Sequence, residues 1–180
     1  GIDSAVTASL CSKSFGSEQI LGVIMPEKES NDSSRILAEK VAKKFNFKTE
    51  IMDITKILES FGVYDLKEKI VKEKFPQFTS ECKYRVVVPP KSKNIIGIPF
   101  LEILDEENKT HKLKISSSDF LTLTAATSIK HRVRMTSLYF HGEKNNFSVV
   151  GTTNKSEYQQ GYFVKYGDGG SDIEPLVNIY

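Results

Sequence analysis

A strand-helix-strand pattern near the start of the chain limits the fold more than any other feature of the sequence. "ILGVIMP" (residues 20–26) is a short apolar run closed by proline, typical of a strand buried on both faces of a parallel sheet. "RILAEKVAKKF" (35–45) then has helical periodicity, and "KTEIMDI" (48–54) predicts the next strand. This order and spacing predict a βαβ unit with a right-handed crossover.

Two further helices and a third strand complete the predicted core. Residues 3–13 have helical spacing that ends at Gly16, and the helix over 35–45 follows a turn with three candidate caps, Asn31, Asp32 and Ser33. "FSVVGTT" (147–153) is a second buried-type strand, followed by a polar helix start at Asn154. The alternation predicts a doubly wound α/β parallel sheet, which binds ligands at the carboxyl ends of its strands.

The pattern in the middle of the chain predicts an α+β insertion at about residues 55–116. It holds two lysine-rich helical segments, a strand at Val86-Val87-Val88 before Pro89-Pro90, and a hairpin from "IPFLEIL" to "HKLKI" across "DEENK". The longest helical pattern then follows, "SSSDFLTLTAATSIKHRVRMTSLYFHG", and we expect it to be the central helix. Its predicted apolar side is formed by Leu121, Ala125, Ile129 and Val133. We expect one domain over residues 1–180.

Composition excludes several classes of partner. The 25 basic and 23 acidic residues leave a net charge of +2, and no apolar run approaches the roughly 20 residues that cross a bilayer. We therefore expect neither nucleic acid nor a membrane as a partner. Cys11 and Cys82 lie far apart, outside any paired metal spacing, and are typical of reduced thiols in a cytoplasmic protein.

Three polar stretches fall where a strand should meet a helix or loop: "GIDS", "GTTNKSE" and "KYGDGGSD". The first would place backbone N–H groups, a carboxylate and a hydroxyl at a helix start, which suits a phosphate with its cation, although Asp3 or Ser4 as a simple cap is the plainer interpretation. Glu157 in the second lies where it could hold Mg²⁺ or favour the helix dipole. The third is either a turn or a close backbone approach to a ligand.

Other candidate groups point away from covalent catalysis. In "KHRVR" (130–134), Arg132 and Arg134 cannot share the apolar face, so one of them could bind an anion or both could be solvated. The three histidines have no metal or dyad spacing, and the serines lack a nucleophile elbow. We therefore predict no catalytic nucleophile, and favour nucleotide chemistry by positioning and electrostatics.

Taken together, these stretches resemble a known family. "GIDSA" is similar to the tail of the Ser-Gly-Gly-x-Asp-Ser loop of the N-type ATP pyrophosphatases, a group with a Rossmann-like fold of the adenine nucleotide alpha hydrolase type. "GVIMPEKESND", "SIKHRVRM" and "VVGTTNKSEYQQGYFVKYGDGGSDIEPL" resemble NAD synthetase within that group. By this resemblance the chain is expected to be a piece of a longer protein that starts inside the ATP loop and is incomplete at both ends.

The resemblance implies an ATP-dependent amide ligase. It would adenylate the carboxylate of deamido-NAD and amidate it with ammonia, releasing AMP and pyrophosphate, in a cytoplasmic homodimer. Gly1, Asp3, Ser4 and Thr152 would bind ATP, and Asp3 and Glu157 would hold Mg²⁺. Arg132, Lys165 and Asp172 would bind deamido-NAD. The ammonia source is left open between free ammonia and a glutaminase domain or partner.

Two departures from the family pattern leave the acid substrate open. Ser128 stands where the family usually has asparagine, and the insertion at 55–116 is longer than in the common bacterial enzymes. The alternatives are amidation of another carboxylic acid, such as a sugar acid, or a catalytically silent nucleotide-binding scaffold. The presence of both magnesium candidates, Asp3 and Glu157, argues against the silent scaffold.

Overall fold

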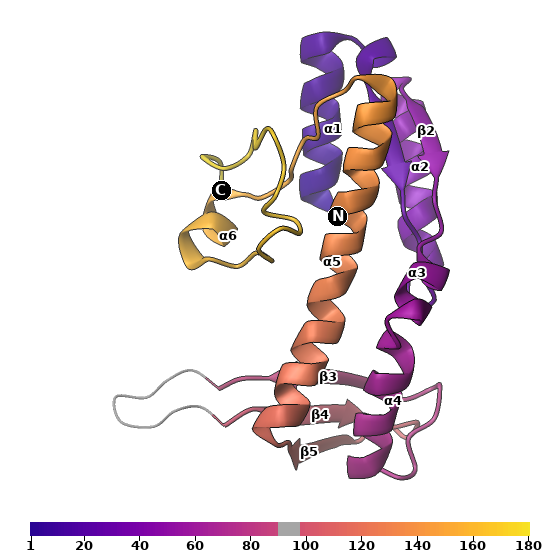
Figure 1. Ribbon diagram of the computed structural model, residues 1–180, viewed down its shortest axis with the longest axis vertical. Helices are drawn as coiled ribbons and strands as arrows, with labels where there is room; N and C mark the ends of the chain where they lie inside the picture. Colours follow the sequence, from indigo (N-terminus) through magenta and orange to yellow (C-terminus); the bar gives the residue numbers. More distant parts are fainter. Residues whose placement is uncertain (90–97) are drawn as a thin grey trace. The chain divides into compact units, whose positions relative to one another are not determined.

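The computed structural model describes residues 1–89 and 98–180 and divides them into two compact units. The first unit contains Gly1–Ser60 and Ser128–Tyr180, and the second contains Phe61–Thr127, which begins and ends later than the predicted insertion at 55–116. Figure 1 colours the elements of both units in chain order. A single domain over residues 1–180 stays a prediction. Pro90, which was expected just beyond a strand, lies outside the described residues.

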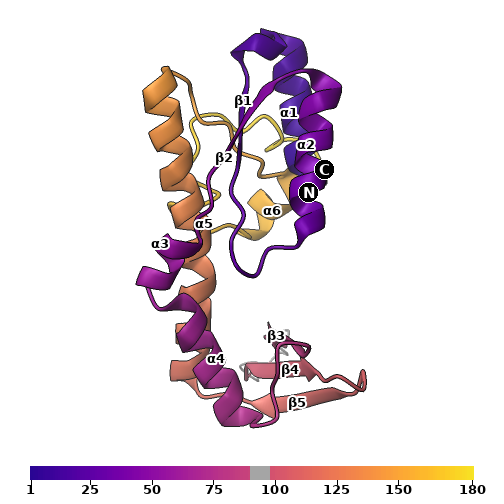
Figure 2. The same ribbon diagram turned by 90° about the vertical axis from the view of Figure 1, so that its right-hand side faces the viewer.

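The first unit contains the predicted βαβ unit. Strand β1 (Leu21–Ile24) pairs in parallel with β2 (Lys48–Ile51), and α2 (Asp32–Phe45) connects them. Figure 2 shows α2 alongside α1 (Ile2–Phe15), next to the strand pair. Of the three candidate caps, the structure uses Asn31, whose side chain accepts the Ser33 N–H at 2.9 Å.

Helix α1 ends where the sequence predicts. Gly16 follows its last residue with a φ of 90°, a conformation that favours glycine, and the short 3₁₀ turn η1 (Ser17–Gln19) leads into β1. The residues of β1 are half-buried, so the expectation of a strand buried on both faces is wrong. The cause is the sheet itself, which in the described part of the chain has only the two strands β1 and β2.

The strand expected at residues 147–153 is reduced to one parallel bridge, between Val150 and Ile173. The backbone here bonds to the C-terminal segment, because the Gly151 N–H donates to the Ile173 carbonyl at 2.7 Å. The Val149 N–H donates to a side chain, the Asp172 carboxylate, and a side-chain acceptor cannot continue a ladder. Helix α6 (Lys155–Gln160) follows, as its polar start predicts.

The central helix α5 (Ser117–Asn145) is the longest in the described residues, but of its predicted apolar side only Val133 is buried. Leu121 and Ala125 are exposed. A stripe at helical spacing is buried instead, formed by Leu123, Ala126, Lys130, Val133, Ser137 and His141. Periodicity of apolar residues could not identify this side, because half of the stripe is polar. Among the described residues, no helix combines the length and apolar character needed to cross a bilayer.

The second unit contains a three-stranded antiparallel sheet, helix α4 (Val63–Lys74) and the first turns of α5. Its strands, in the order β3 (Lys83–Val87), β4 (Phe100–Leu104) and β5 (Thr110–Lys114), confirm the predicted hairpin. Helix α4 lies over the sheet (Figure 1). The short helix α3 (Thr55–Ser60) precedes it and belongs to the first unit.

Apolar side chains from the sheet, from α4 and from the first turns of α5 form the core of the second unit. The alternation along β4 places two residues in this core, both fully buried, as period-two patterning requires. The cluster consists of Ile70, Val71, Phe75, Cys82, Leu101, Ile103, Ile115 and Leu123.

Candidate functional site

The start of α1 presents backbone donors together with the first group of predicted site residues. Gly1 is the N-cap and makes no side-chain capping bond, while Asp3 and Ser4 lie in the first turn. Gly1 and Ser4 are exposed and Asp3 is half-buried. The first N–H groups of a helix have no partner within the helix and carry its positive dipole end, so this turn suits a phosphate.

Asn154 links the two carboxylates predicted to hold magnesium. It caps α6, where its Oδ1 accepts the Glu157 N–H at 3.1 Å and the Glu157 Oε2 accepts the Asn154 N–H at 3.1 Å, a complete capping box. The same Asn154 side chain donates from Nδ2 to the Asp3 Oδ1 at 3.4 Å. One asparagine therefore brings the start of α1 next to the start of α6.

This donor set is chemically suited to Mg²⁺ bound together with a nucleotide. Magnesium is usually held by one or two carboxylates plus substrate phosphates, and rarely by an all-protein cage. Within residues 1–89 and 98–180 there is no group of three or more His, Cys, Asp or Glu side chains that could hold a metal. Asp3 and Glu157, from two helix starts, match the first arrangement and leave the remaining positions to phosphate oxygens.

The segment that contains Thr152 is fixed from both sides. The Thr153 N–H donates to the Glu174 Oε2 at 3.1 Å, and the Glu174 Oε1 accepts the Ser171 hydroxyl at 2.5 Å. A Cβ at Gly151 would lie 2.2 Å from both the Glu174 Oε1 and the Ser171 Oγ, so a larger residue here would have to displace these two side chains. Thr152 is half-buried between these bonded residues.

The glycine-rich loop lies against α5, which carries the predicted substrate residue Arg132. The Arg132 Nε donates to the Lys165 carbonyl at 3.1 Å. Three residues after Lys165, the Asp168 Oδ1 accepts the Val164 N–H at 2.9 Å and lies 3.4 Å from the His131 Nδ1. The structure thus brings Arg132 and Lys165 together through the backbone, and leaves the Lys165 side chain exposed beside the Tyr166 ring.

Both oxygens of the Asp172 carboxylate accept hydrogen bonds. Oδ2 accepts the Val149 N–H at 2.7 Å and Oδ1 accepts the Tyr139 hydroxyl at 2.8 Å. These bonds, the backbone one first, hold the pKa of Asp172 below its usual value, and the bond to Asp172 raises the pKa of Tyr139. Asp172 is therefore an ionised, oriented carboxylate at the end of the loop.

A buried ion pair is formed by Lys130 of α5, which precedes the two loop-contacting residues His131 and Arg132. The Lys130 Nζ lies 2.9 Å from the Glu27 Oε1 and 2.6 Å from the Glu29 Oε2, and the side chains of Lys130 and Glu27 are 10% and 6% exposed. Glu27 and Glu29 come from the turn after β1. The pair therefore fixes α5 to the βαβ unit.

Sequence reasoning missed three residues of this region: Tyr139, Lys130 as a buried ion, and Asn154 as a link to Asp3. For Asn154 a signal exists, since Asn-x-x-Glu is the spacing of a capping box. Tyr139 has none, because its partner Asp172 lies 33 residues away.

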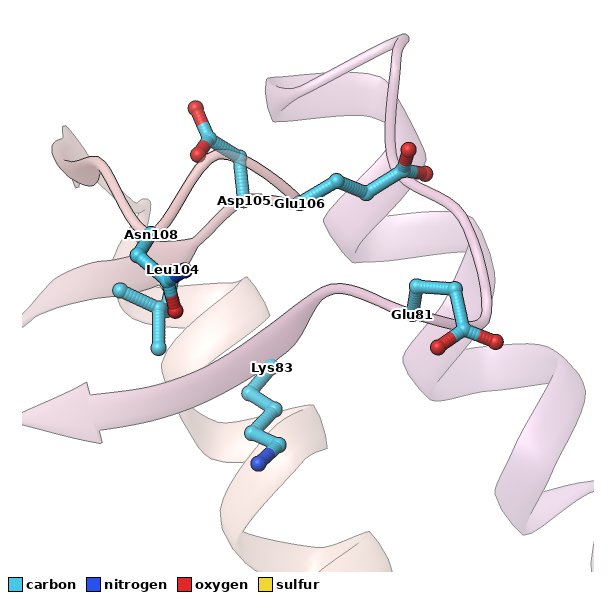
Figure 3. A pocket seen from close by; sticks show the side chains of 6 residues that line it. All are labelled: Glu81, Lys83, Leu104, Asp105, Glu106 and Asn108. Atoms are coloured by element: carbon cyan, nitrogen blue, oxygen red, sulfur yellow. The ribbon is translucent and has the colours of Figure 1, made fainter.

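A cavity of about 410 Å³ in the second unit contains none of the predicted site residues. Figure 3 shows the side chains that line it: Glu81, Lys83, Leu104, Asp105, Glu106 and Asn108. Asp105 is already used by the β4–β5 turn, where its Oδ1 accepts the Lys109 N–H and its Oδ2 lies 2.6 Å from the His111 Nε2.

Comparisons with known proteins identify the family of the chain. The NAD synthase family model matches residues 1–88 and 94–180, which is most of the chain and includes every predicted site residue. The chain belongs to the NAD synthase family. It is 35% identical over 181 residues to the NH(3)-dependent NAD(+) synthetase of Mesorhizobium japonicum, and 35% identical over 182 residues to that of Thermotoga maritima.

These NAD synthetase relatives are longer than the chain. The alignments cover all of this chain, but only 57% of the Mesorhizobium protein and 59% of the Thermotoga protein. The chain thus spans a little more than half the length of these relatives.

Solved structures establish the NAD synthetase fold. The NH3-dependent NAD synthetase from Campylobacter jejuni superposes with a TM-score of 0.63 at 24% identity, over 100% of this chain and 55% of that chain. The glutamine-dependent NAD+ synthetase from Acinetobacter baumannii, in complex with ADP, gives a TM-score of 0.65 at 22% identity, over 100% and 25%. These likenesses confirm the predicted Rossmann-like α/β class.

Proposed function

We propose that the protein is an ATP-dependent amide ligase that converts deamido-NAD and ammonia to NAD. The observation that carries this proposal is the family match, supported by Asn154, which caps α6 in a capping box with Glu157 and donates a hydrogen bond to Asp3 at the start of α1. The NH(3)-dependent NAD(+) synthetases among the relatives support the choice of acid and of ammonia.

The chemistry requires two displacements. An oxygen of the deamido-NAD carboxylate attacks the α-phosphorus of ATP, and the bond to the β-phosphate oxygen breaks to release pyrophosphate. Ammonia then attacks the carbonyl carbon, the carbon–oxygen bond to AMP breaks, and the nitrogen loses a proton to give the amide. Neither step needs a protein nucleophile, so positioned charges and donors are sufficient.

Each candidate residue has a role in this scheme. The N–H groups at the start of α1, with Gly1, Ser4 and Thr152, bind the ATP phosphates. Asp3 and Glu157 hold Mg²⁺, which offsets the charge on the leaving pyrophosphate when it is bound. The deamido-NAD is bound by Arg132, Lys165 and Asp172; Arg132 lies on α5 and donates to the Lys165 carbonyl, and Asp172 accepts the hydroxyl of Tyr139 on the same helix.

Some parts of the proposal rest on the family resemblance alone. They are Mg²⁺ as the ion, a homodimer as the assembly, and the cytoplasm as the location. The ammonia is taken up free or delivered by a glutaminase domain or partner.

The substitution Glu157→Gln tests the proposed metal site. Glutamine is accepted in a capping box, so the start of α6 should be retained while the charge is lost. We expect AMP formation from ATP, ammonia and deamido-NAD to fall at least about 10-fold, with an increased requirement for Mg²⁺. Glu143→Gln, on an exposed position of α5, is the matched control and should keep the wild-type rate.

Three results would contradict parts of this proposal. Unchanged turnover in Glu157→Gln would remove Glu157 from the metal site. Wild-type protein that forms no AMP with deamido-NAD, but does so with another carboxylic acid, would replace the substrate while keeping the adenylation step. No AMP with any acid would favour a silent scaffold.

A further inference from the structure

The Tyr139 side chain contacts both the Gly170 carbonyl and the Asp172 carboxylate, at the end of the glycine-rich loop. We propose that Tyr139 is a positioning residue for deamido-NAD binding: it holds Asp172 and the loop at residues 165–172 in place without touching the substrate. This inference rests on the proposed function, because it assumes that Asp172 binds deamido-NAD.

The hydrogen bonds of the Tyr139 hydroxyl connect α5 to two points of the loop. It donates to the Asp172 Oδ1 at 2.8 Å and to the Gly170 carbonyl at 2.9 Å. A phenol has a single proton, so the two acceptors share it. The bond to Asp172 is charge-assisted and is the stronger of the two. Tyr139 therefore fixes the direction in which the carboxylate points.

The second oxygen of Asp172 connects the loop to Val149. It accepts the Val149 N–H at 2.7 Å. A rotation of the Asp172 side chain would break this bond as well. Tyr139 consequently acts on the loop and, through Asp172, on Val149. The residues on both sides of Thr152 are held separately, since the Gly151 N–H donates to the Ile173 carbonyl and the Thr153 N–H to Glu174.

A separate contact anchors the other end of the loop. Arg132 holds the Lys165 carbonyl, and Gly167 lies so close to α5 that a Cβ there would be 2.9 Å from the His131 Cβ. Residues 132 and 139 are two helical turns apart, which is about 10 Å along α5. The loop is thus attached at both ends to one rigid helix. Removing the Tyr139 attachment would release the end that carries Asp172.

The test is Tyr139→Phe, which removes one hydroxyl and keeps the ring. Val149 and the loop amides are followed by hydrogen exchange, and the KM values for deamido-NAD and ATP are measured separately. We expect the Val149 amide to exchange about 10-fold faster and the KM for deamido-NAD to rise about 10-fold, with little change in the KM for ATP. Tyr162→Phe, at an exposed tyrosine, is the matched control.

The outcomes separate a positioning role from a general structural one. Unchanged Val149 exchange and an unchanged KM for deamido-NAD overturn the inference. An equal rise in both KM values with a lower thermal midpoint also overturns it, because Tyr139 would then only stabilise the fold. If wild-type protein does not use deamido-NAD, the proposed function fails by itself. In that case the exchange data still decide the structural part: faster Val149 exchange in Tyr139→Phe than in wild type supports the positioning of Asp172, and equal exchange rates in the two proteins refute it.

Discussion

The interiors of the two units differ in chemistry. In the second unit the described core is an apolar cluster built from the sheet, α4 and the start of α5. In the first unit the interior mixes apolar side chains with polar and charged ones. Of the residues that the structure describes, all six buried polar or charged residues lie in the first unit: Thr7, Glu27, Lys130, Ser137, His141 and Thr153.

The apolar core and the polar interior differ in how precisely they specify the positions of neighbouring elements. Apolar packing is tolerant, since a core of suitable volume folds with many combinations of side chains. Buried polar groups need specific partners in specific directions, and such networks fix how elements are oriented. The first unit carries every candidate site residue, and two contacts connect α5 to the βαβ unit: Lys130 forms an ion pair with Glu27, and the His141 Nδ1 lies 3.0 Å from the Glu50 Oε2. The second unit carries none of them.

The largest loss of stability is expected at Lys130, in the polar interior of the first unit. Lys130→Met should lower the free energy of unfolding by about 3–5 kcal/mol, because Glu27 would keep its negative charge in a buried position without its cation. Chemical unfolding in urea measures the change. The control is Arg35→Met, which breaks an exposed ion pair with Glu39 on α2 and should cost less than about 1 kcal/mol.

An equal loss of stability in the Lys130 and Arg35 variants would remove the distinction between a polar and an apolar interior. Recovery of stability in the double variant Glu27→Gln/Lys130→Met would strengthen it, since the unpaired charge would then be absent.

A slightly smaller effect is expected in the apolar core of the second unit. Leu101 is fully buried on β4, so Leu101→Ala should lower the free energy of unfolding by about 2–5 kcal/mol through lost burial and a cavity. Leu101→Met, which conserves volume, should cost less than about 1.5 kcal/mol. The same urea titrations measure both variants. If Leu101→Met is as unstable as Leu101→Ala, the apolar core does not tolerate a side chain of similar volume but different shape, and the contrast with the first unit fails.

The smallest effect is a pH dependence in the second unit. The hydrogen bond from His111, followed by that from the Lys109 N–H, lowers the pKa of Asp105. A lowered folded-state pKa contributes stability above the ordinary value of about 3.9, and this contribution is lost as the pH falls through the folded-state pKa. The stability difference between wild type and Asp105→Asn should therefore shrink as the pH falls from 7 to below 4. A difference that stays constant over this range would contradict the assignment.

The sequence was sufficient for features that depend on near neighbours. An apolar run closed by proline predicted β1, Gly16 predicted the end of α1, and the segments "IPFLEIL" and "HKLKI" on either side of "DEENK" predicted the β4–β5 hairpin. The motif stretches also predicted the family, because they are long and specific. Each of these signals is contained within a short segment, where propensity and capping chemistry decide the structure.

The sequence was insufficient where partners are distant. The buried side of α5 contains Lys130 and His141, whose partners are the carboxylates of Glu27 and Glu50, so a search for apolar periodicity selected the wrong side. The Tyr139–Asp172 bond spans 33 positions and has no local pattern. The predicted strand at 147–153 depended on a neighbour that the described sheet does not provide.

The side chain of Asn154 has a consequence for which residues that position can accept. At an ordinary helix start, asparagine, aspartate and serine are nearly equivalent, because each offers an oxygen to the first turn. Here the amide nitrogen is used too, as a donor to the Asp3 carboxylate. Aspartate would keep the cap but set two negative charges against each other, and serine would be too short to reach both partners. Position 154 is thus selective for asparagine, because the amide oxygen of this side chain caps α6 while its amide nitrogen donates to Asp3 of α1.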